Sequence, residues 1–267
     1  MSRSGFYDYQ WRQAHPNIDA EEVALIARIK EMAAATRSSY GSRRMAKALQ
    51  DEGFAVGRVK VRRLMNEAGV KVERGKRRAP VTTDSRHGYE VAPNLLARHF
   101  DVDEPDQAWV GDITYVWTAE GWLYVSTLLD LYSRKIVGWA MNSRIDTTLV
   151  KDALQMALGR RHPSAGLIHH SDRGSQYASH AYRDLLKEHG IECSMSGKGE
   201  CLDNAVAERF FGSLKREWTS HRSYGTRQEA RDDIIAYIEM FYNSTRKHSY
   251  LGYVSPNEYE KSALVLN

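Results

Sequence analysis

The sequence predicts an α/β protein in which a small, all-α, helix-turn-helix-like region precedes a mixed sheet flanked by helices. Three observations lead to this prediction. The chain has 267 residues, which is enough for about two domains. Its basic residues gather in the first part of the chain. From about residue 109 onward, β-rich and helical segments follow the order βββαβαβαα, which is typical of a mixed sheet covered by helices.

The composition favours a globular protein of the cell interior. Hydrophobic residues make up 42% and charged residues 27%, which supports a buried core. The two cysteines, Cys193 and Cys201, supply neither a disulfide framework nor a four-ligand zinc site, so we expect reduced thiols. No apolar run approaches the about 18 residues of a membrane span, and the N-terminus has no signal-peptide core. We therefore expect a cytoplasmic protein without a membrane partner.

Residues 1–72 are predicted to form an N-terminal helical region that binds DNA. The net charge is +4, and between residues 37 and 78 Lys and Arg far outnumber Asp and Glu, which favours a polyanionic partner. Helical periodicity predicts helices in NIDAEEVALIARIKEMAAAT, GSRRMAKALQDEG and GRVKVRRLMNEAGV. Gly53 and Gly69 are placed to end the second and third of them.

The third predicted helix has the character of a DNA recognition helix. Such a helix needs one packed face and one cationic face, and here apolar residues alternate with basic ones. The basic residues expected to contact DNA are Arg58, Lys60, Arg62 and Arg63. A plain helical lid is the alternative. Residues 73–105 follow as a basic linker without sustained periodicity, in which Arg77 and Arg78 are expected to track phosphates.

Residues 106–267 are predicted to form the sheet and its helices. The runs AWVGDITYVW, GWLYVSTLLDLYS and KIVGWAMN are β-rich and separated by short polar turns, which predicts an antiparallel meander. A helix in DTTLVKDALQMALGR, capped near Asp146 or Thr147, precedes a short buried strand in GLIHHSD. A helix in SHAYRDLLKEHG, a strand in IECSMS and two helices, in NAVAERFFGSLKREW and TRQEARDDIIAYIEMFYNST, complete the region.

Three carboxylates interrupt these apolar segments. Asp112 lies inside a β run, Asp172 ends a short strand, and Glu208 lies in a helix after 35 intervening residues. A buried carboxylate is costly unless it is paired or binds a metal. Neighbouring strands and a helix behind them can bring the three together, and such an oxygen-only cluster suits Mg²⁺ or Mn²⁺. Two such ions can clamp the attacking and leaving oxygens of a phosphodiester.

These stretches resemble a known family. The chain is similar to insertion-sequence transposases with a retroviral-integrase-like catalytic core, and more narrowly to the downstream-frame product of two-reading-frame insertion sequences, of the DD(35)E type. The similar stretches are GDITY, LDLYSRKIVGW, HHSDRGSQY, SMSGKGECLDNAVAERFFGSLKRE and FYNSTRKHSYLGYVSPNEYE. The helical front resembles the DNA-binding module that precedes this core in the same group.

The resemblance implies an RNase H-like fold for residues 106–267 and a catalytic, metal-binding role for Asp112, Asp172 and Glu208. It implies two Mg²⁺ or Mn²⁺ ions, cleavage at the element ends, and strand transfer by the freed 3′-OH. Lys215 matches a basic residue that contacts DNA near the element end. Other residues would support Asp172 or touch the scissile strand: His169, His170, Arg173 and Gln176.

The resemblance also implies partners. The DNA would be the terminal inverted repeats and the target, paired ends would require a homodimer or larger assembly, and an upstream-frame protein, separate or fused, would help to recognise the ends. The protein would act in the bacterial cytoplasm, at the nucleoid. Two alternatives stay open: an RNase H-type nuclease, and a DNA-binding regulator built on a decayed core.

Several other residues are given structural roles. We expect Asp203 to cap the helix of Glu208 and Asp130 to hold a turn through Ser133 or Arg134. A zinc pair of His169 and His170 is the weaker alternative to a supporting role, because no further His or Cys stands at ligand spacing. The tryptophans at 109, 117, 122 and 139 are expected in the core, with base-stacking platforms as the weaker alternative. The segment with Arg246, Lys247 and His248 is expected to serve packing, although these three could reach phosphate.

Overall fold

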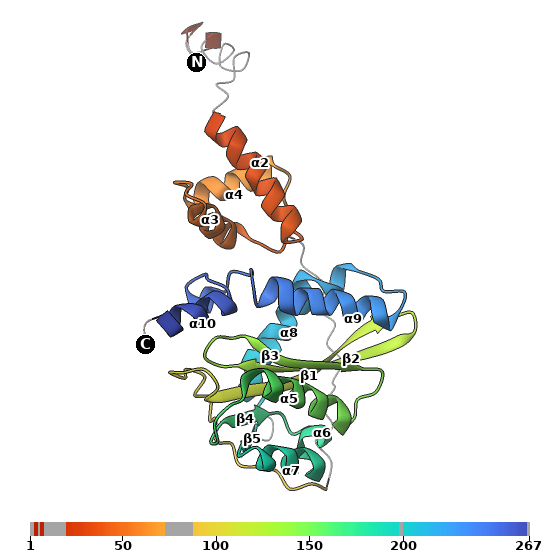
Figure 1. Cartoon of the computed structure of the whole chain (residues 1–267). Helices are drawn as coiled ribbons and strands as arrows, with labels where there is room; N and C mark the ends of the chain where they lie inside the picture. Colours follow the sequence, from red (N-terminus) through yellow and green to blue (C-terminus); the bar gives the residue numbers. More distant parts are fainter. Residues whose placement is uncertain (1–2, 5, 8–19, 73–87, 198–199, 266–267) are drawn as a thin grey trace. The chain divides into compact units, whose positions relative to one another are not determined.

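A computed structural model describes residues 3–4, 6–7, 20–72, 88–197 and 200–265 (Figure 1). The chain divides into two compact units, residues 1–73 and residues 74–267. Each unit is described by itself. Among the described residues, the search for a membrane-spanning helix finds none of sufficient length and apolarity.

The first unit is a small helical cluster. Its helices are α2 (Ala20–Ala35), α3 (Ser42–Asp51) and α4 (Arg58–Glu67). Each helix turns an apolar stripe inward, and the residues with no exposed surface are Leu25, Ile29, Met45, Leu49, Val61 and Leu64. Gly53 and Gly69 follow α3 and α4 with φ values of +92° and +69°, a left-handed conformation that glycine adopts without strain. The predicted helix ends are confirmed.

The second unit is built on a five-stranded sheet in the order β3-β2-β1-β4-β5. The antiparallel strands β1 (Ala108–Thr118), β2 (Gly121–Asp130) and β3 (Ile136–Asn142) form the predicted meander. Two short strands, β4 (Ile168–Ser171) and β5 (Glu192–Met195), continue the sheet parallel to β1. The sheet is therefore mixed, as the sequence predicts, and β1 lies in its middle.

Helices cover both faces of this sheet (Figure 1). On one face lie α5 (Thr147–Arg161), α6 (Ser175–Ala178) and α7 (His180–Glu188); on the other lie α8 (Ala205–Glu217) and α9 (Arg227–Ile235). The shorter or later helical segments are η1 (Cys201–Asn204), η2 (Thr219–His221), the π-helix η3 (Ala236–Tyr242), η4 (Ser249–Leu251) and α10 (Pro256–Val265).

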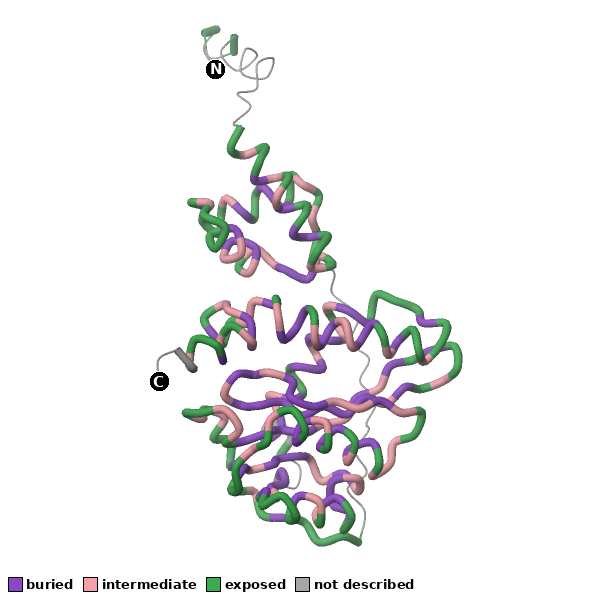
Figure 2. The backbone as a smooth tube through the Cα atoms, viewed as in Figure 1, coloured by how far each residue is buried: buried purple, intermediate pink, exposed green. Residues whose placement is uncertain are grey.

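The main core lies between the sheet and α5. Figure 2 shows buried backbone along the strands and on the inner sides of the helices. Trp109, Leu128 and Val137 from the sheet pack with Val150, Ala153 and Leu154 from α5. A Cβ on Gly138 would lie 2.3 Å from the backbone oxygen of Ala153, so glycine is required for this close approach. The predicted cap is confirmed, because the Asp146 carboxylate accepts a hydrogen bond from the Leu149 N–H at 3.1 Å.

A buried ion pair holds α8 from its C-terminal end. Arg246 is 3% exposed and donates two hydrogen bonds of 2.6 Å to the carboxylate of Glu217. Phe210, Phe211 and Leu214 are buried along the same helix. Arg246 therefore has a packing role, and the alternative in which it reaches a phosphate is not supported.

Residues 88–105 contain neither helix nor strand and pack against the sheet and helices of the second unit, to which they belong. The Pro93 carbonyl accepts a hydrogen bond from the Met195 N–H, and the side chains of Asn94 and Arg98 donate to Asp203 at 2.9 and 2.7 Å. The prediction that Asp203 caps α8 is wrong, because Asn204 occupies the cap position. The prediction for Asp130 is confirmed, since Ser133 donates to it from both its N–H and its hydroxyl.

Candidate active site

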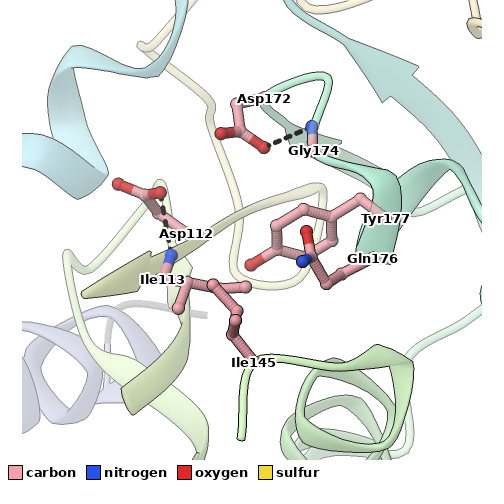
Figure 3. Close-up of a pocket in the computed structure, with 7 residues that line it drawn as sticks. All are labelled: Asp112, Ile113, Ile145, Asp172, Gly174, Gln176 and Tyr177. Atoms are coloured by element: carbon pink, nitrogen blue, oxygen red, sulfur yellow. Dashed lines mark hydrogen bonds between the residues drawn. The ribbon is translucent and has the colours of Figure 1, made fainter. Parts of the chain in front are cut away.

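Asp112 and Asp172 meet at one end of the sheet. Val110 of β1 pairs with His170 of the parallel strand β4, and each aspartate lies two residues beyond its paired residue. The register therefore brings both to the same level. Figure 3 shows the two carboxyl groups pointing into the same opening. The pocket is lined by Asp112, Ile113, Ile145, Asp172, Gly174, Gln176 and Tyr177.

Local hydrogen bonds hold the two carboxylates, and the surroundings of Asp112 are unfavourable to its negative charge. The Ile113 N–H donates to Asp112 at 2.8 Å, and the Gly174 N–H donates to Asp172 at 2.9 Å. Burial, and then the charges of Asp172 and Glu208, raise the pKa of Asp112 well above its usual value. A carboxylate in such surroundings is stabilised by a cation.

Glu208 approaches the pair from the first turn of α8. The Asn204 side chain, at the start of this helix, donates to the backbone oxygen of Gly111 at 3.3 Å, and this bond ties α8 to β1 beside Asp112. Glu208 is exposed, although the surrounding protein removes enough water from its carboxyl group to raise its pKa. Among the described residues, no three Asp, Glu, His or Cys side chains are arranged to hold one metal ion together. Two of the predicted carboxylates thus adjoin, and the third is close enough to act on Asp112 electrostatically.

His170 is buried and ties β4 to β5. Its Nδ1 is hydrogen-bonded to the Ser194 hydroxyl at 2.8 Å and its Nε2 to the Ser196 hydroxyl at 3.2 Å. Burial lowers its pKa to about 4, so the ring is neutral at physiological pH. Because the side chain is 0% exposed and both nitrogens are engaged, the predicted contact of His170 with DNA is not supported. A supporting role next to Asp172 is what its position allows.

The position of the His169 ring explains why a glycine directly precedes Asp112. Its Nε2 is hydrogen-bonded to the Tyr182 hydroxyl at 3.0 Å, and burial lowers its pKa to about 3. A Cβ on Gly111 would lie 2.9 Å from that same nitrogen, so the ring can pack against β1 only where the strand has no side chain. The described residues give His169 and His170 no third metal ligand, and the zinc alternative gains no support.

The other predicted contacts of the core surround the pocket. Gln176 lines it, and Arg173 donates from Nε to the Ser196 carbonyl at 2.6 Å. Lys215 lies on α8 with its Nζ 4.4 Å from the centre of the Tyr115 ring. Burial lowers the pKa of Lys215, while the negative charge of Asp112 opposes this shift. Lys215 is therefore near enough to the pocket to act on Asp112.

In the first unit, the basic residues of α4 separate into two groups. Arg63 and Lys60 both pair with Glu22 of α2, at 2.5 and 3.5 Å. Arg62 is exposed, and Arg58 is also exposed, with its Nε 3.4 Å from the Ser42 hydroxyl. The two predicted linker residues, Arg77 and Arg78, lie outside the described residues.

Sequence reasoning missed two residues that shape the site. Tyr177 is 2% exposed and forms a wall of the pocket, and Asn204 ties α8 to β1. The position of Asn204 directly before a helix was an available signal, because asparagine is favoured where a helix begins. For Tyr177 the available signal was its place five residues after Asp172 in HHSDRGSQY.

In this mixed sheet, the middle strand and its parallel neighbour bring two aspartates together, and a helix that carries a glutamate is tied behind them. This is the architecture of an integrase-type catalytic core. The comparisons agree with this class. The family model described as "Integrase core domain" matches residues 102–201, a second model of the same description matches residues 189–256, and the "HTH-like domain" model matches residues 20–78.

Proteins of insertion sequences match nearly the whole chain. The "Insertion element IS600 uncharacterized 31 kDa protein" of Shigella sonnei is 45% identical over 96% of this chain and 93% of its own length. The "Transposase for insertion sequence element IS904" of Lactococcus lactis is 40% identical over 90% and 95%. "Transposase InsF for insertion sequence IS3A" of Escherichia coli is 39% identical over 99% and 92%.

The chain belongs to the insertion-sequence transposases. It is a polynucleotidyl transferase with an RNase H-like integrase core and an N-terminal helix-turn-helix-like region. The predicted fold class and the predicted family resemblance are both confirmed.

Proposed function

We propose that this transposase cleaves DNA at the ends of its insertion sequence and joins the freed 3′-OH to target DNA, with Asp112, Asp172 and Glu208 as its catalytic carboxylates. The observation that carries the proposal is the position of the two aspartates at the same level of adjoining parallel strands. The bond from Asn204 to Gly111 adds the helix of Glu208 to the same place.

The three carboxylates would hold divalent ions, two Mg²⁺ or Mn²⁺ in the active complex. The donors fit such ions, because they are oxygen ligands and because burial and like charges make the ionised form of Asp112 unfavourable without a cation. When bound, two ions of this kind stabilise the attacking and leaving oxygens of a phosphodiester.

The remaining residues of the pocket would position the DNA. Lys215 would bring a positive charge to the scissile strand, because its ammonium group already lies between α8 and β1. Gln176 would donate to the strand from the pocket wall, and Arg173 would reach a phosphate beside it. The bonds of His170 to β5 would keep the loop of Asp172 in place.

The first unit would recognise the terminal inverted repeats through α4. Arg58 and Arg62 are exposed on this helix and are the side chains we expect to reach the DNA. Lys60 and Arg63 would first of all hold α4 against α2, because both pair with Glu22. Arg77 and Arg78 would add phosphate contacts from the following segment.

The reaction requires two element ends, so the active form would be a homodimer or a larger assembly on paired ends. An upstream-frame protein, separate or fused, would help to recognise the ends. Together they would act in the bacterial cytoplasm, at the nucleoid. The similarity to transposases of bacterial insertion sequences supports the bacterial setting.

A strand-transfer assay on labelled terminal DNA tests the proposal. We expect Asp172→Asn to reduce cleavage and joining by at least about 100-fold, because a neutral amide removes a ligand charge, and to leave DNA binding unchanged. Asp184→Asn is the matched control, because Asp184 is an exposed aspartate on α7. Full joining by Asp172→Asn would reject the catalytic assignment.

The same assay separates the alternatives. Joined products from the wild type support the transposase. Hydrolysis without joining would indicate an RNase H-type nuclease, and binding without chemistry would indicate a regulator.

A further inference from the structure

Three aromatic side chains form a row at the end of the β1–β2 hairpin, and two of them are exposed. This aromatic row consists of Tyr115, Trp117 and Trp122. Trp117 is 60% exposed and Trp122 41%, so the prediction that they lie in the core is wrong, whereas Trp109 is buried as predicted. The rings of Trp117 and Trp122 pack edge to face with centres 4.7 Å apart, and those of Tyr115 and Trp122 with centres 4.9 Å apart.

The lengths of the strands explain the exposure. Trp117 and Trp122 are partners in the β1–β2 register. The strand β4 pairs with β1 only from Ala108 to Val110, and the pairing of β3 with β2 reaches no nearer to the hairpin end than Tyr124. The end of the hairpin therefore extends past both neighbouring strands.

The exposed end of the hairpin is nevertheless held in place. The Ala119 N–H donates to the Tyr224 carbonyl at 3.0 Å. Arg227 donates from its Nε to the Trp122 carbonyl at 3.0 Å and from its backbone N–H to the Glu120 carboxylate at 2.8 Å. Large apolar rings that are fixed before binding lose little conformational entropy when a ligand packs on them.

The aromatic row leads directly to the pocket. Alternate residues of a strand share one face, so Tyr115 and Trp117 continue the face of Ile113, which lines the pocket. From Ile113 to Trp117 the strand rises about 13 Å, at about 3.3 Å per residue. This length corresponds to about four base steps of a DNA strand.

A positive charge lies where the row meets the pocket. The Nζ of Lys215 is 4.4 Å from the centre of the Tyr115 ring, and its charge also acts on Asp112. Aromatic rings beside a cation suit a ligand that presents flat π-faces and negative charges together. A nucleotide strand has both.

We propose that the aromatic row stacks against unpaired bases of the DNA strand whose scissile phosphate lies at the Asp112–Asp172 pocket. This inference rests on the proposed function and adds a base-stacking surface to it. Stacking of this kind does not depend on base identity, because every base has a π-face. The row thus binds a frayed DNA end in preference to a fully paired one.

The experiment compares two DNA probes with the full-length chain in buffer without divalent ions, so that binding is measured without chemistry. One probe is terminal DNA with about four unpaired bases at its end, one of them 2-aminopurine, and the other is the same sequence fully paired. We expect Trp117→Ala to weaken binding of the frayed probe by about 5- to 150-fold, the equivalent of about 1–3 kcal/mol for one stacked base. Binding of the paired probe should change less than about twofold.

Two further variants control the comparison. Trp117→Phe keeps a ring and should retain most of the affinity and the quenching of 2-aminopurine. Met240→Ala removes an exposed apolar side chain from η3 and should bind both probes like the wild type.

Three results would overturn the inference. Trp117→Ala and the wild type could bind the frayed probe with equal affinity, or Trp117→Ala could lose the same affinity for both probes. A change in the sedimentation coefficient of Trp117→Ala would show that the row is a contact between protein chains. In each case, joining by the wild type would leave the proposed function intact. Absence of joining by the wild type would instead count against the proposed function, whatever Trp117→Ala does.

Discussion

Arg246→Ala tests whether the C-terminal end of α8 depends on one buried ion pair. The Arg246 guanidinium is 3% exposed and donates to both oxygens of Glu217, and it also contacts the Ser213 hydroxyl at 3.3 Å. Burial would lower the pKa of Arg246, but hydrogen bonding to Glu217 outweighs it and raises that pKa, so the guanidinium is charged. Removing the arginine leaves the Glu217 carboxylate buried without its main partner.

Breaking such a pair from one side costs about 3–5 kcal/mol. For a unit of about 150–250 residues, each kcal/mol corresponds to about 2–4 °C in the unfolding midpoint, so we expect the midpoint of the second unit to fall by about 6–20 °C. Tryptophan fluorescence is a suitable readout, because Trp218 is buried beside Tyr237 and Phe241.

The double variant Arg246→Ala with Glu217→Ala completes a thermodynamic cycle. If the ion pair is the cause, the double variant loses less stability than the sum of the single variants. A loss below about 1 kcal/mol for Arg246→Ala would refute the reasoning, because that is the range of exposed ion pairs. Weaker DNA binding by a fully stable Arg246→Ala would instead return Arg246 to the DNA contacts.

Two further predictions concern the carboxylates and α4. The pKa of Asp112 is higher in the folded chain than the about 3.9 of an unfolded aspartate. Ionised Asp112 therefore destabilises the folded state at pH values above its folded-state pKa, and this destabilisation disappears below about pH 4, where the group is protonated in both states. Without divalent ions, Asp112→Asn should therefore raise the thermal unfolding midpoint at pH 7 but not at pH 3.5, by about 2–4 °C for each kcal/mol of unfolding free energy gained. Added Mg²⁺ should stabilise only the wild type. An unchanged midpoint of Asp112→Asn at pH 7 would contradict this prediction. Arg62→Ala should weaken binding of terminal DNA about tenfold, measured by fluorescence anisotropy. Lys60→Ala should weaken it less, because Lys60 pairs with Glu22. A larger loss of affinity for Lys60→Ala than for Arg62→Ala would show that the Lys60–Glu22 pair breaks when DNA binds.

The order of strands and helices was predictable because it depends on local patterns. The apolar runs around Trp109 and Leu128 have the period of strands, and residues such as Asp146, Gly53 and Gly69 mark helix ends through their own conformational preferences. Such signals are complete within a few residues. They do not depend on what packs against them.

The errors concern contacts between distant segments. Trp117 and Trp122 lie in a strand-like run, and nothing local shows that β4 and β3 end before reaching them. Asp203 precedes a helix as a cap would, yet its carboxylate accepts hydrogen bonds from Asn94 and Arg98, more than 100 residues earlier.

The candidate site shows the same division. The convergence of Asp112 and Asp172 was predictable from their places in strands, and the sequence spacing of Glu208 matched the family. The burial of His170 between two serines of the β5 region could not be predicted, because only the pairing of β4 with β5 brings Ser194 and Ser196 to it.

The middle position of β1 divides the site into a fixed part and adjustable parts. Asp112 lies inside β1, where its backbone pairs with Thr127 of β2, and β1 pairs with β4 up to Val110, two residues before it, so Asp112 shifts less easily than a residue at the end of an element. Asp172 stands just past the last residue of β4, and Glu208 stands in the first turn of α8, where the backbone has fewer restraints. If the proposed site binds a cation, the three acids are therefore expected to close around it mainly by movement at these two termini, with β1 as the reference point.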